Sequence, residues 1–373
     1  MGKATYKEIF EALKKDILGG KYDVAHALPS VGALARKYGV ARATVHHSLD
    51  ELFHHGLILR KQGSGTFVSR QGASRKIGLI LPGLAYSEFF EPIASALIRH
   101  ARERDYTLLF SDVFSKDASK RSDEAIASAK DLVAHHAAGV LFQPLEGFAG
   151  CEKRNMLVLS ILKENGMPVV LLDSDYTPKL RRSGYDVVSL NNLEAGMQLA
   201  RHLVEMGAKN IHFLRWPDFS PSVEEREFGM SVVISQTRGR GFAKTGDRAL
   251  VTDPGDVEAV RKYCRRHRPD AFICATDMAA AGLKQSLEQC GLRVPDDVLL
   301  AGFDDVRVAR FMTPPLTTIR QPGDSIARIA FDRLIARLAN PMMGGAEINV
   351  YGSLIVRAST QRRPAASGRR KGK

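Results

Sequence analysis

The sequence predicts an α/β protein in which a small N-terminal winged helix-turn-helix precedes a two-lobed body of two doubly wound parallel sheets. Two observations predict this class. Residues 1–70 combine three amphipathic helical segments with a glycine-bearing hairpin. From residue 77 onward, short apolar runs alternate with helix-length amphipathic stretches, as is typical of parallel strands covered on both faces. Seven such runs are many for one sheet, which favours two lobes.

The N-terminal segment divides into three helices and a hairpin. Apolar residues over 6–18 recur at the spacing of one helix face. Ser30 can cap a second helix, because its side-chain oxygen can accept a backbone N–H of the first turn. A third helix is expected over 42–55, with Gly56 at its end. Residues 57–70 then alternate as strand, glycine-rich turn and strand, which indicates a wing.

The seven apolar runs and the helices between them are expected at defined positions in the body. The strands are expected at 77–82, 107–112, 139–144, 168–173, 210–215, 271–276 and 298–303, and the helices at 90–104, 119–137, 192–206, 255–267 and 278–290.

Positive charge is concentrated at the two ends of the chain. The net charge is +13, of which residues 1–76 carry +7 and residues 361–373 carry +6, so the intervening body is neutral. A basic folded domain on a neutral body is what binding to a phosphate backbone requires. The alternative is a basic surface that serves solubility alone.

Residues 5–69 resemble the winged-helix domain of GntR-type regulators over the whole segment and in the same order. The resemblance implies that the third helix enters the major groove of DNA and that the wing tip approaches the minor groove. The residues that carry it are Leu28-Pro29-Ser30, Leu34-Ala35, Tyr38-Gly39-Val40, Arg42, Thr44-Val45, Leu49, Leu52, Gly56-Leu57-Ile58 and Gly63-Ser64-Gly65-Thr66-Phe67-Val68.

The residues expected to contact DNA lie at the cap of the second helix, on the first turns of the third helix and on the wing. They are Ser30, Arg42, Ala43, Thr44, His46, Arg60, Lys61, Gln62, Gly63 and Gly65. The alternative for Arg42 is an ordinary surface charge. Three positions depart from the usual pattern: Gly32 and His46 stand where an Arg is common, and Ala41 stands where Ser or Thr usually begins the third helix. The missing cap costs the helix about 1 kcal/mol.

The domain boundaries follow composition. Residues 71–76 are small and polar, as in a linker, and residues 361–373 are expected to be a disordered basic tail. The effector-binding body is expected over 77–360. Its first lobe is expected at about 77–190 and 317–340, and its second at about 191–316 and 345–360.

Residues 77–360 resemble the effector domain of LacI-type regulators, which is related to periplasmic sugar-binding proteins. The resemblance implies two lobes around a ligand cleft and a dimer built through this domain. The residues that carry it are Val169 to Asp173, Asn191-Asn192, Ala195-Gly196, His202-Leu203, Gly207, Arg226, Gly229, Thr276-Asp277-Met278-Ala279, Gly291-Leu292, Val294-Pro295-Asp296-Asp297, Gly302-Phe303-Asp304-Asp305 and Pro314-Pro315-Leu316-Thr317-Thr318-Ile319.

Polar side chains at strand ends are the candidates for effector binding, because ligands of open parallel sheets bind outside the carboxyl ends of the strands. Asp173, Thr276, Asp277 and Asp304 fall at such ends. Arg226 offers a planar fork that can hold two ligand oxygens. By the resemblance, Arg226, Thr276 and Asp304 occupy ligand-contact positions.

Other residues near these strand ends have two interpretations each. Trp216 can cover the apolar face of a sugar or pack on a lobe surface, and Phe90 can line the mouth of the site or belong to the core. Asp277 can bind effector or cap the following helix. Asp305 is interpreted as a helix-start or structural carboxylate.

The motifs that would indicate other functions are missing from the sequence. There is no GxSxG elbow, HExxH or Cys/His cluster, so no cofactor, metal or catalytic residue is expected. Four cysteines without a CxxC pair indicate free thiols. No apolar run is long enough for a membrane span or a signal peptide, and a cytoplasmic protein is expected.

Together these patterns predict a DNA-binding transcription regulator, expected to be a repressor. A homodimer is expected to bind a double-stranded operator, and a small sugar-like effector in the interlobe cleft is expected to control that binding. One rival is an enzyme fused to a winged helix, which would need a nucleophile or a Schiff-base lysine in the cleft. Another is a sugar-binding transport component, which would need an export signal.

Overall fold

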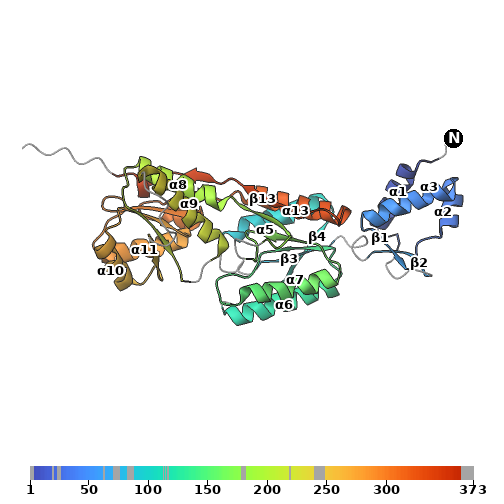
Figure 1. Ribbon diagram of the computed structural model, residues 1–373, viewed down its shortest axis with the longest axis horizontal. Helices are drawn as coiled ribbons and strands as arrows, with labels where there is room; N and C mark the ends of the chain where they lie inside the picture. The colour runs from blue at the N-terminus through green and yellow to red at the C-terminus, as the bar shows by residue number, and fades with distance from the viewer. Residues whose placement is uncertain are drawn as a thin grey trace, which may run out of the picture. The chain divides into compact units, whose positions relative to one another are not determined.

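The computed structural model describes residues 4–18, 21–22, 27–61, 64–69, 76–81, 88–111, 113, 115, 117–177, 182–217, 220–238 and 248–362. They form two compact units. The first comprises the chain up to Leu145 with Gly150–Val188 and Asp324–Ile348, and the second comprises Glu146–Ala149, Ser189–Gly323 and the chain from Asn349. Figure 1 shows the elements of each unit along the chain.

The N-terminal domain is a three-helix core with a two-stranded wing, as predicted. Its helices bury one apolar stripe each, including Ile9, Leu34 and Leu49. The wing strands pair antiparallel from Ile58 opposite Val68 to Lys61 opposite Gly65. The elements are α1 (Tyr6–Leu18), α2 (Val31–Tyr38), α3 (Arg42–His54), β1 (Ile58–Lys61) and β2 (Gly65–Val68).

The ends of these helices follow the expected chemistry. Ser30 caps α2, since its Oγ accepts the Ala33 N–H at 3.2 Å. Ala41 precedes α3 without a side-chain cap. Gly39 and Gly56 have φ of +66° and +67°, a conformation that favours glycine. The helix α3 ends at His54, and His55 is its C-cap.

The first unit contains a six-stranded sheet in the order β13-β7-β6-β5-β3-β4. The strands from β4 to β7 pair in parallel. In Figure 1, α6 and α7 cover one face of the sheet and α5 and α13 cover the other. The elements are β3 (Lys76–Ile80), α5 (Phe90–Glu103), β4 (Thr107–Ser111), α6 (Ala118–Ala134), β5 (Gly139–Phe142), α7 (Cys151–Glu164), β6 (Val169–Leu172), β7 (Asp186–Leu190), α13 (Gly323–Ala339) and β13 (Glu347–Val350).

The second unit repeats this design in the order β14-β12-β11-β10-β8-β9, with β14 antiparallel to β12. The remaining neighbours pair in parallel. Its elements are α8 (Asn192–Glu205), β8 (Ile211–Arg215), α9 (Pro221–Arg238), β9 (Ala249–Val251), α10 (Val257–His267), β10 (Ala271–Cys274), α11 (Asp277–Gln289), β11 (Leu299–Asp304), α12 (Arg307–Phe311), β12 (Thr317–Arg320), β14 (Ser353–Ile355) and the 3-10 turn η1 (Ala358–Thr360).

The second sheet is covered on both faces because its central strands carry apolar side chains on both sides. Phe213, Ile273 and Phe303 join the cluster that also contains residues of α8 and α9. Their chain neighbours, such as Phe272, join a separate cluster with residues of α10 and α11. This alternation follows from the two-residue period of a strand. The prediction of doubly wound sheets is therefore confirmed.

The structure corrects several expected boundaries. Residues 317–340 were expected in the first lobe, but β12 lies in the second sheet because Ala301 to Asp304 of β11 pair with Thr317 to Arg320. Residues 345–360 were expected in the second lobe, but β13 hydrogen-bonds to β7 of the first sheet through Val187 N–H and the Ala346 carbonyl. Lys76 was expected in the linker and is the first residue of β3. Residues 71–75 and 363–373 lie outside the described part.

Two further features concern membrane spans and disulfides. Among the described residues, no helix has both the length and the apolar character needed to cross a membrane. The four cysteines are free thiols, as predicted, with Cys264 and Cys274 buried.

Candidate DNA-binding face and effector site

The third helix exposes the residues that were predicted to reach DNA. Arg42, Ala43 and His46 are exposed and Thr44 is half-buried, whereas Val45 on the opposite side is buried. The position of α3 is fixed from behind, because the buried Ser48 hydroxyl donates to the Tyr6 carbonyl of α1 at 2.9 Å. Within the described residues, the Arg42 guanidinium makes no hydrogen bond or ion pair, so its donors are available to a ligand.

The wing cations are held in place by neighbours in the same domain. Arg60 Nη2 lies 2.6 Å from Asp50 Oδ1 of α3, and the guanidinium lies over the Phe53 ring. Lys61 lies over the Phe67 ring, 5.1 Å from its centroid. Exposed pairs of this kind contribute about 0–1 kcal/mol, so a phosphate can compete for either cation. Gly65 is exposed with φ of +112°, and Gln62 and Gly63 lie outside the described residues.

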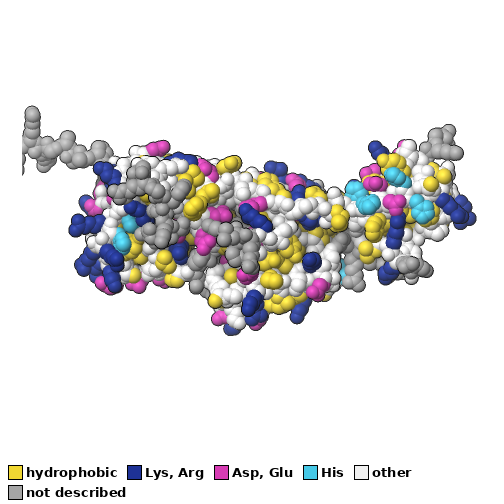
Figure 2. Space-filling model, viewed as in Figure 1, with side chains coloured by type: hydrophobic (Ala, Val, Ile, Leu, Met, Phe, Trp, Pro, Cys, Tyr) yellow, Lys and Arg dark blue, Asp and Glu magenta, His cyan; other side chains and the backbone are white. Residues whose placement is uncertain are grey.

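The start of α2 lies beside the start of α3. The Ser30 hydroxyl is exposed at the cap of α2, where the helix dipole favours an anion. A Cβ on Gly32 would stand 3.7 Å from Arg42 Nη2, so the glycine that replaces the usual Arg borders the key side chain. Figure 2 shows Lys, Arg and His side chains across the visible face of this domain.

In the second unit, Arg226 is brought to the sheet by close packing of α8 against α9. A Cβ at Gly196 would overlap the Arg226 carbonyl, and a Cβ at Gly229 would overlap the Leu193 carbonyl, so only glycine permits this approach. The Arg226 side chain is buried. Its Nε donates to Asn192 Oδ1 and its Nη1 to the Ala275 carbonyl, both at 2.8 Å.

Asp304 faces Arg226 at the carboxyl end of β11. Its Oδ1 lies 3.8 Å from Arg226 Nη1 and accepts a hydrogen bond of 2.6 Å from Gln321 Nε2. The guanidinium also lies over the Phe303 ring, 4.5 Å from its centroid. Burial raises the pKa of Asp304, and Arg226 and Gln321 oppose that rise by stabilising the carboxylate. The pair thus places the remaining donors of Arg226 beside the carboxyl group of Asp304.

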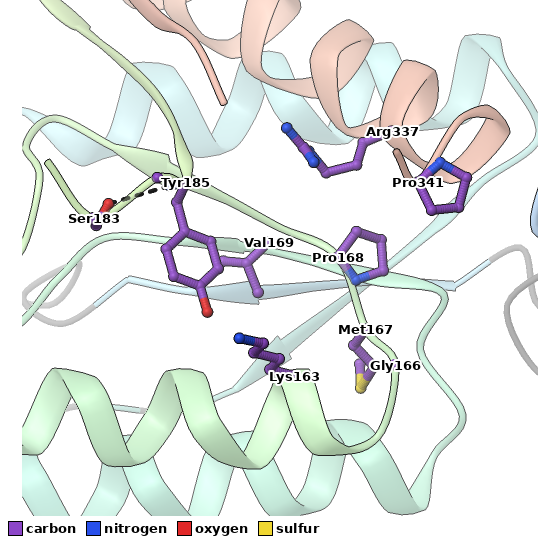
Figure 3. A pocket seen from close by; sticks show the side chains of 10 residues that line it. Lys163, Gly166, Met167, Pro168, Val169, Ser183, Tyr185, Arg337 and Pro341 are labelled. Atoms are coloured by element: carbon purple, nitrogen blue, oxygen red, sulfur yellow. Dashed lines mark hydrogen bonds between the residues drawn. The ribbon is translucent and has the colours of Figure 1, made fainter. Parts of the chain in front are cut away.

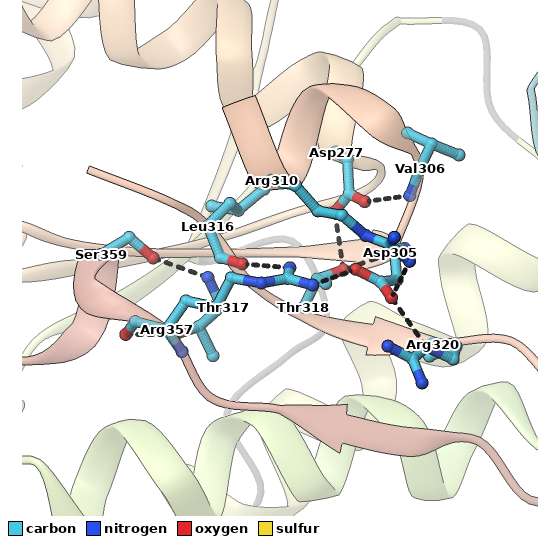
Figure 4. Close-up of polar contacts among 10 residues, drawn as sticks. All are labelled: Asp277, Asp305, Val306, Arg310, Leu316, Thr317, Thr318, Arg320, Arg357 and Ser359. Atoms are coloured by element: carbon cyan, nitrogen blue, oxygen red, sulfur yellow. Dashed lines mark hydrogen bonds and ion pairs between the residues drawn. The ribbon is translucent and has the colours of Figure 1, made fainter. Parts of the chain in front are cut away.

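Thr276 caps a helix and its contact with effector stays a prediction, whereas Asp277 does not have the role that its position suggested. Thr276 is the cap of α11, because its Oγ1 accepts the Ala279 N–H at 3.1 Å. The alternative that Asp277 caps this helix is therefore wrong. The prediction that Asp277 binds effector is corrected too, because it is fully buried and its carboxyl accepts from Thr318 Oγ1 at 2.6 Å and Val306 N–H at 3.0 Å. It is a structural carboxyl that joins β12 and the start of α12 to α11 (Figure 4).

Asp305 is the structural carboxylate that was expected. Three arginines surround it, as Figure 4 shows: Arg357, Arg320 at 2.7 Å and Arg310 at 3.3 Å. Burial alone would raise the pKa of Asp305, but hydrogen bonds from Arg357 and Arg320 outweigh it and lower the pKa. With its oxygens occupied, Asp305 locks β11 to β12 and to the chain after β14.

The remaining predicted residues lie in two places. Trp216 follows β8 and packs half-buried against the cluster on the α10 and α11 face, which is the packing interpretation. Asp173 follows β6 in the first unit and has φ of +71°. Phe90 begins α5, is 4% exposed and contacts Phe89 at a ring-centroid distance of 4.6 Å.

Sequence reasoning missed three polar residues near these strand ends. Asn192 holds Arg226, Gln321 holds Asp304, and Gln143 follows β5 in the first unit. The buried Oε1 atoms of Gln143 and Gln321 accept no hydrogen bond within the described residues, so each can receive a ligand hydroxyl. A polar residue directly after an apolar run was the available signal for Gln143, whose run ends as GVLFQP.

The buried Asp277 makes stability depend on pH. Burial raises its pKa to about 8, and the nearby Asp304 adds to the rise. The unfolded chain therefore ionises Asp277 near its ordinary pKa while the folded chain stays protonated, so stability is lost as pH rises toward 8. We expect Asp277→Asn to raise the Tm relative to the parent chain, by a difference that grows between pH 5 and pH 8. Scanning calorimetry measures this, with Asp123→Asn on exposed α6 as the control. A difference that stays constant with pH contradicts the raised pKa.

Comparison with known proteins identifies the family of this chain. Residues 5–68 match the model described as bacterial regulatory proteins, gntR family, and residues 200–360 match that of a periplasmic binding protein-like domain. The HTH-type transcriptional repressor PurR of Salmonella arizonae is 30% identical over 316 residues, covering 80% of this chain and 83% of that protein. The chain belongs to the LacI-type transcription regulators. Its DNA-binding domain is of the GntR type.

Solved structures share the fold of this regulator. The transcriptional regulator CelR in complex with cellobiose has a TM-score of 0.64 and 21% identity, covering 89% of this chain and 100% of that one. The lac repressor dimer bound to operator and the anti-inducer ONPF has a TM-score of 0.62 and 21% identity, covering 77% of this chain and 94% of that one. The relative that is 30% identical, PurR, is a transcriptional repressor and not an enzyme, so the predicted class of transcription regulator is confirmed.

Proposed function

We propose that this regulator is a cytoplasmic repressor that holds its operator as a homodimer and responds to a small polyhydroxylated effector, a sugar or sugar derivative. The observation that carries the proposal is the Arg226–Asp304 pair at the carboxyl edge of the second sheet, beside Gln321, whose Oε1 accepts no hydrogen bond from the described residues. Arginine donors, a carboxylate and an amide oxygen together match the alternating donors and acceptors of a polyol.

The proposed contacts extend to the first unit. Asp173, Gln143 and Phe90 follow or border the carboxyl ends of its strands, where open parallel sheets bind ligands. We propose that the effector is held between the two lobes. The complex of CelR with cellobiose supports the sugar class, and the operator-bound lac repressor dimer supports the assembly. An effector acts only through its different affinity for the DNA-bound and free states.

Two measurements on the full chain test the proposal. The first is a thermal-shift screen of pentoses, hexoses, cellobiose, sugar acids and nucleosides. A ligand at 100 times its Kd adds about 2.7 kcal/mol to the stability of the native state, so we expect one class to raise the Tm. The second measures binding to duplexes selected from a random pool, with and without that compound. We expect the compound to weaken binding. A compound that stabilises the protein and leaves DNA affinity unchanged contradicts its role as effector.

A further inference from the structure

The first unit contains a cavity that neither the DNA-binding face nor the proposed effector site uses. Its volume is ≈380 Å³, and pockets for small molecules span about 300–1,000 Å³. It borders Val169, the first residue of β6, whereas Asp173 follows the last residue of the same strand. The cavity therefore lies at the amino edge of the first sheet, opposite the edge that carries Asp173. We call it the amino-edge pocket (Figure 3).

The amino-edge pocket has an apolar wall, formed in part by Met167 and Val169, and a second wall at Arg337. Met167 is 6% exposed and Val169 is 2% exposed. Arg337 is held by Asp186 and by the carbonyls of Met343 and Gly344, at 3.0 and 3.1 Å. Because the fully buried Asp186 also binds Arg333 at 2.8 Å, two guanidinium groups share one carboxylate and leave this wall positive.

Two donors face the cavity without a protein acceptor. In Figure 3, the Lys163 ammonium at the end of α7 and the Tyr185 hydroxyl before β7 point toward each other. Within the described residues, neither Lys163 Nζ nor Tyr185 Oη makes a hydrogen bond or an ion pair. Burial raises the pKa of Tyr185, so its hydroxyl stays a donor at neutral pH.

We propose that the amino-edge pocket binds a small monocarboxylate with an apolar ring or chain. The carboxylate accepts from Lys163 and Tyr185, and the apolar body lies against Met167 and Val169. A carboxylate with an apolar body suits this pocket better than a sugar, because Lys163 offers donors only and Met167 and Val169 offer apolar surface, whereas a polyol needs many paired donors and acceptors. The site is thus a second input to the regulator, distinct in chemistry and position from the proposed polyol site.

Isothermal titration of the full chain with benzoate, phenylacetate and 3-phenylpropionate tests the proposal. Benzyl alcohol serves as the uncharged analogue. We expect saturable binding of at least one carboxylate, weakened at least tenfold by Lys163→Gln and several-fold by Tyr185→Phe. Lys153→Gln is the matched control, because Lys153 is exposed on the same helix and does not line the pocket. It should bind like the parent chain.

Several titration results would contradict carboxylate binding in the amino-edge pocket. The proposal is overturned if none of the three carboxylates binds, if benzyl alcohol binds as tightly as they do, or if Lys163→Gln and Lys153→Gln behave alike. Asp304→Asn separates the two sites, since it should leave carboxylate binding unchanged. A loss of carboxylate binding in Asp304→Asn assigns the ligand to the effector site and also overturns the proposal.

Discussion

Arg42→Ala is expected to lower operator affinity by at least about 30-fold, while the Tm and effector affinity stay unchanged. Arg42 is exposed on the first turn of α3, where side chains of a recognition helix reach base edges. A bidentate contact to a base contributes about 1–3 kcal/mol, and a dimer makes it twice. Because Arg42 has no partner within the described residues, its removal breaks nothing in the fold. Fluorescence anisotropy at fixed salt measures the loss.

The comparison of operator with random duplex shows what Arg42 reads. Loss on the operator alone indicates base contact, whereas an equal loss on both indicates phosphate contact. Lys15→Ala, on the exposed face of α1, is the control for a general loss of positive charge. Unchanged operator binding by Arg42→Ala would show that α3 does not read the duplex through this residue.

Local patterns were sufficient for much of the fold and insufficient where polar residues are buried by distant partners. The seven predicted strands all exist, because each is a run of mostly apolar residues. The strand β7 begins with Asp186, which is fully buried by Arg333 and Arg337, more than 140 residues away. The strand β12 begins with Thr317 and Thr318, whose hydroxyls bond to Thr360 and Asp277. No local window contains those partners, so these strands do not look apolar.

The same limit applies to the site. The rule that ligands bind at the carboxyl ends of parallel strands predicted Asp304 and Thr276, since it depends only on where apolar runs stop. It could not tell that the Asp277 side chain turns into the protein, because that depends on Thr318 and Val306 from elements that follow. Asn192 and Gln321 were missed for a related reason. Each acts through another side chain, and the sequence does not show which one.

Arg226→Met is expected to weaken effector binding by at least about 100-fold and to leave operator binding without effector intact. Methionine keeps the length and apolar packing of the side chain but removes the guanidinium group and its remaining donors. It also leaves the buried Asp304 without its cation, and burial already raises the pKa of Asp304. That carboxyl then favours its protonated form and stops being a charged acceptor. Hydrogen bonds to charged groups contribute about 1.5–3 kcal/mol each, so two lost bonds account for the expected effect.

Arg226→Lys separates the charge of this residue from its shape. An ammonium can pair with Asp304, but it cannot also hold Asn192 and the Ala275 carbonyl through one planar group. We therefore expect a loss of about tenfold, between the parent chain and Arg226→Met, measured by titration with the effector found in the screen. Arg201→Met removes an exposed arginine of α8 and should change nothing. If Arg226→Met folds, binds operator and binds effector like the parent chain, the pair with Asp304 only supports the sheet and the effector binds elsewhere.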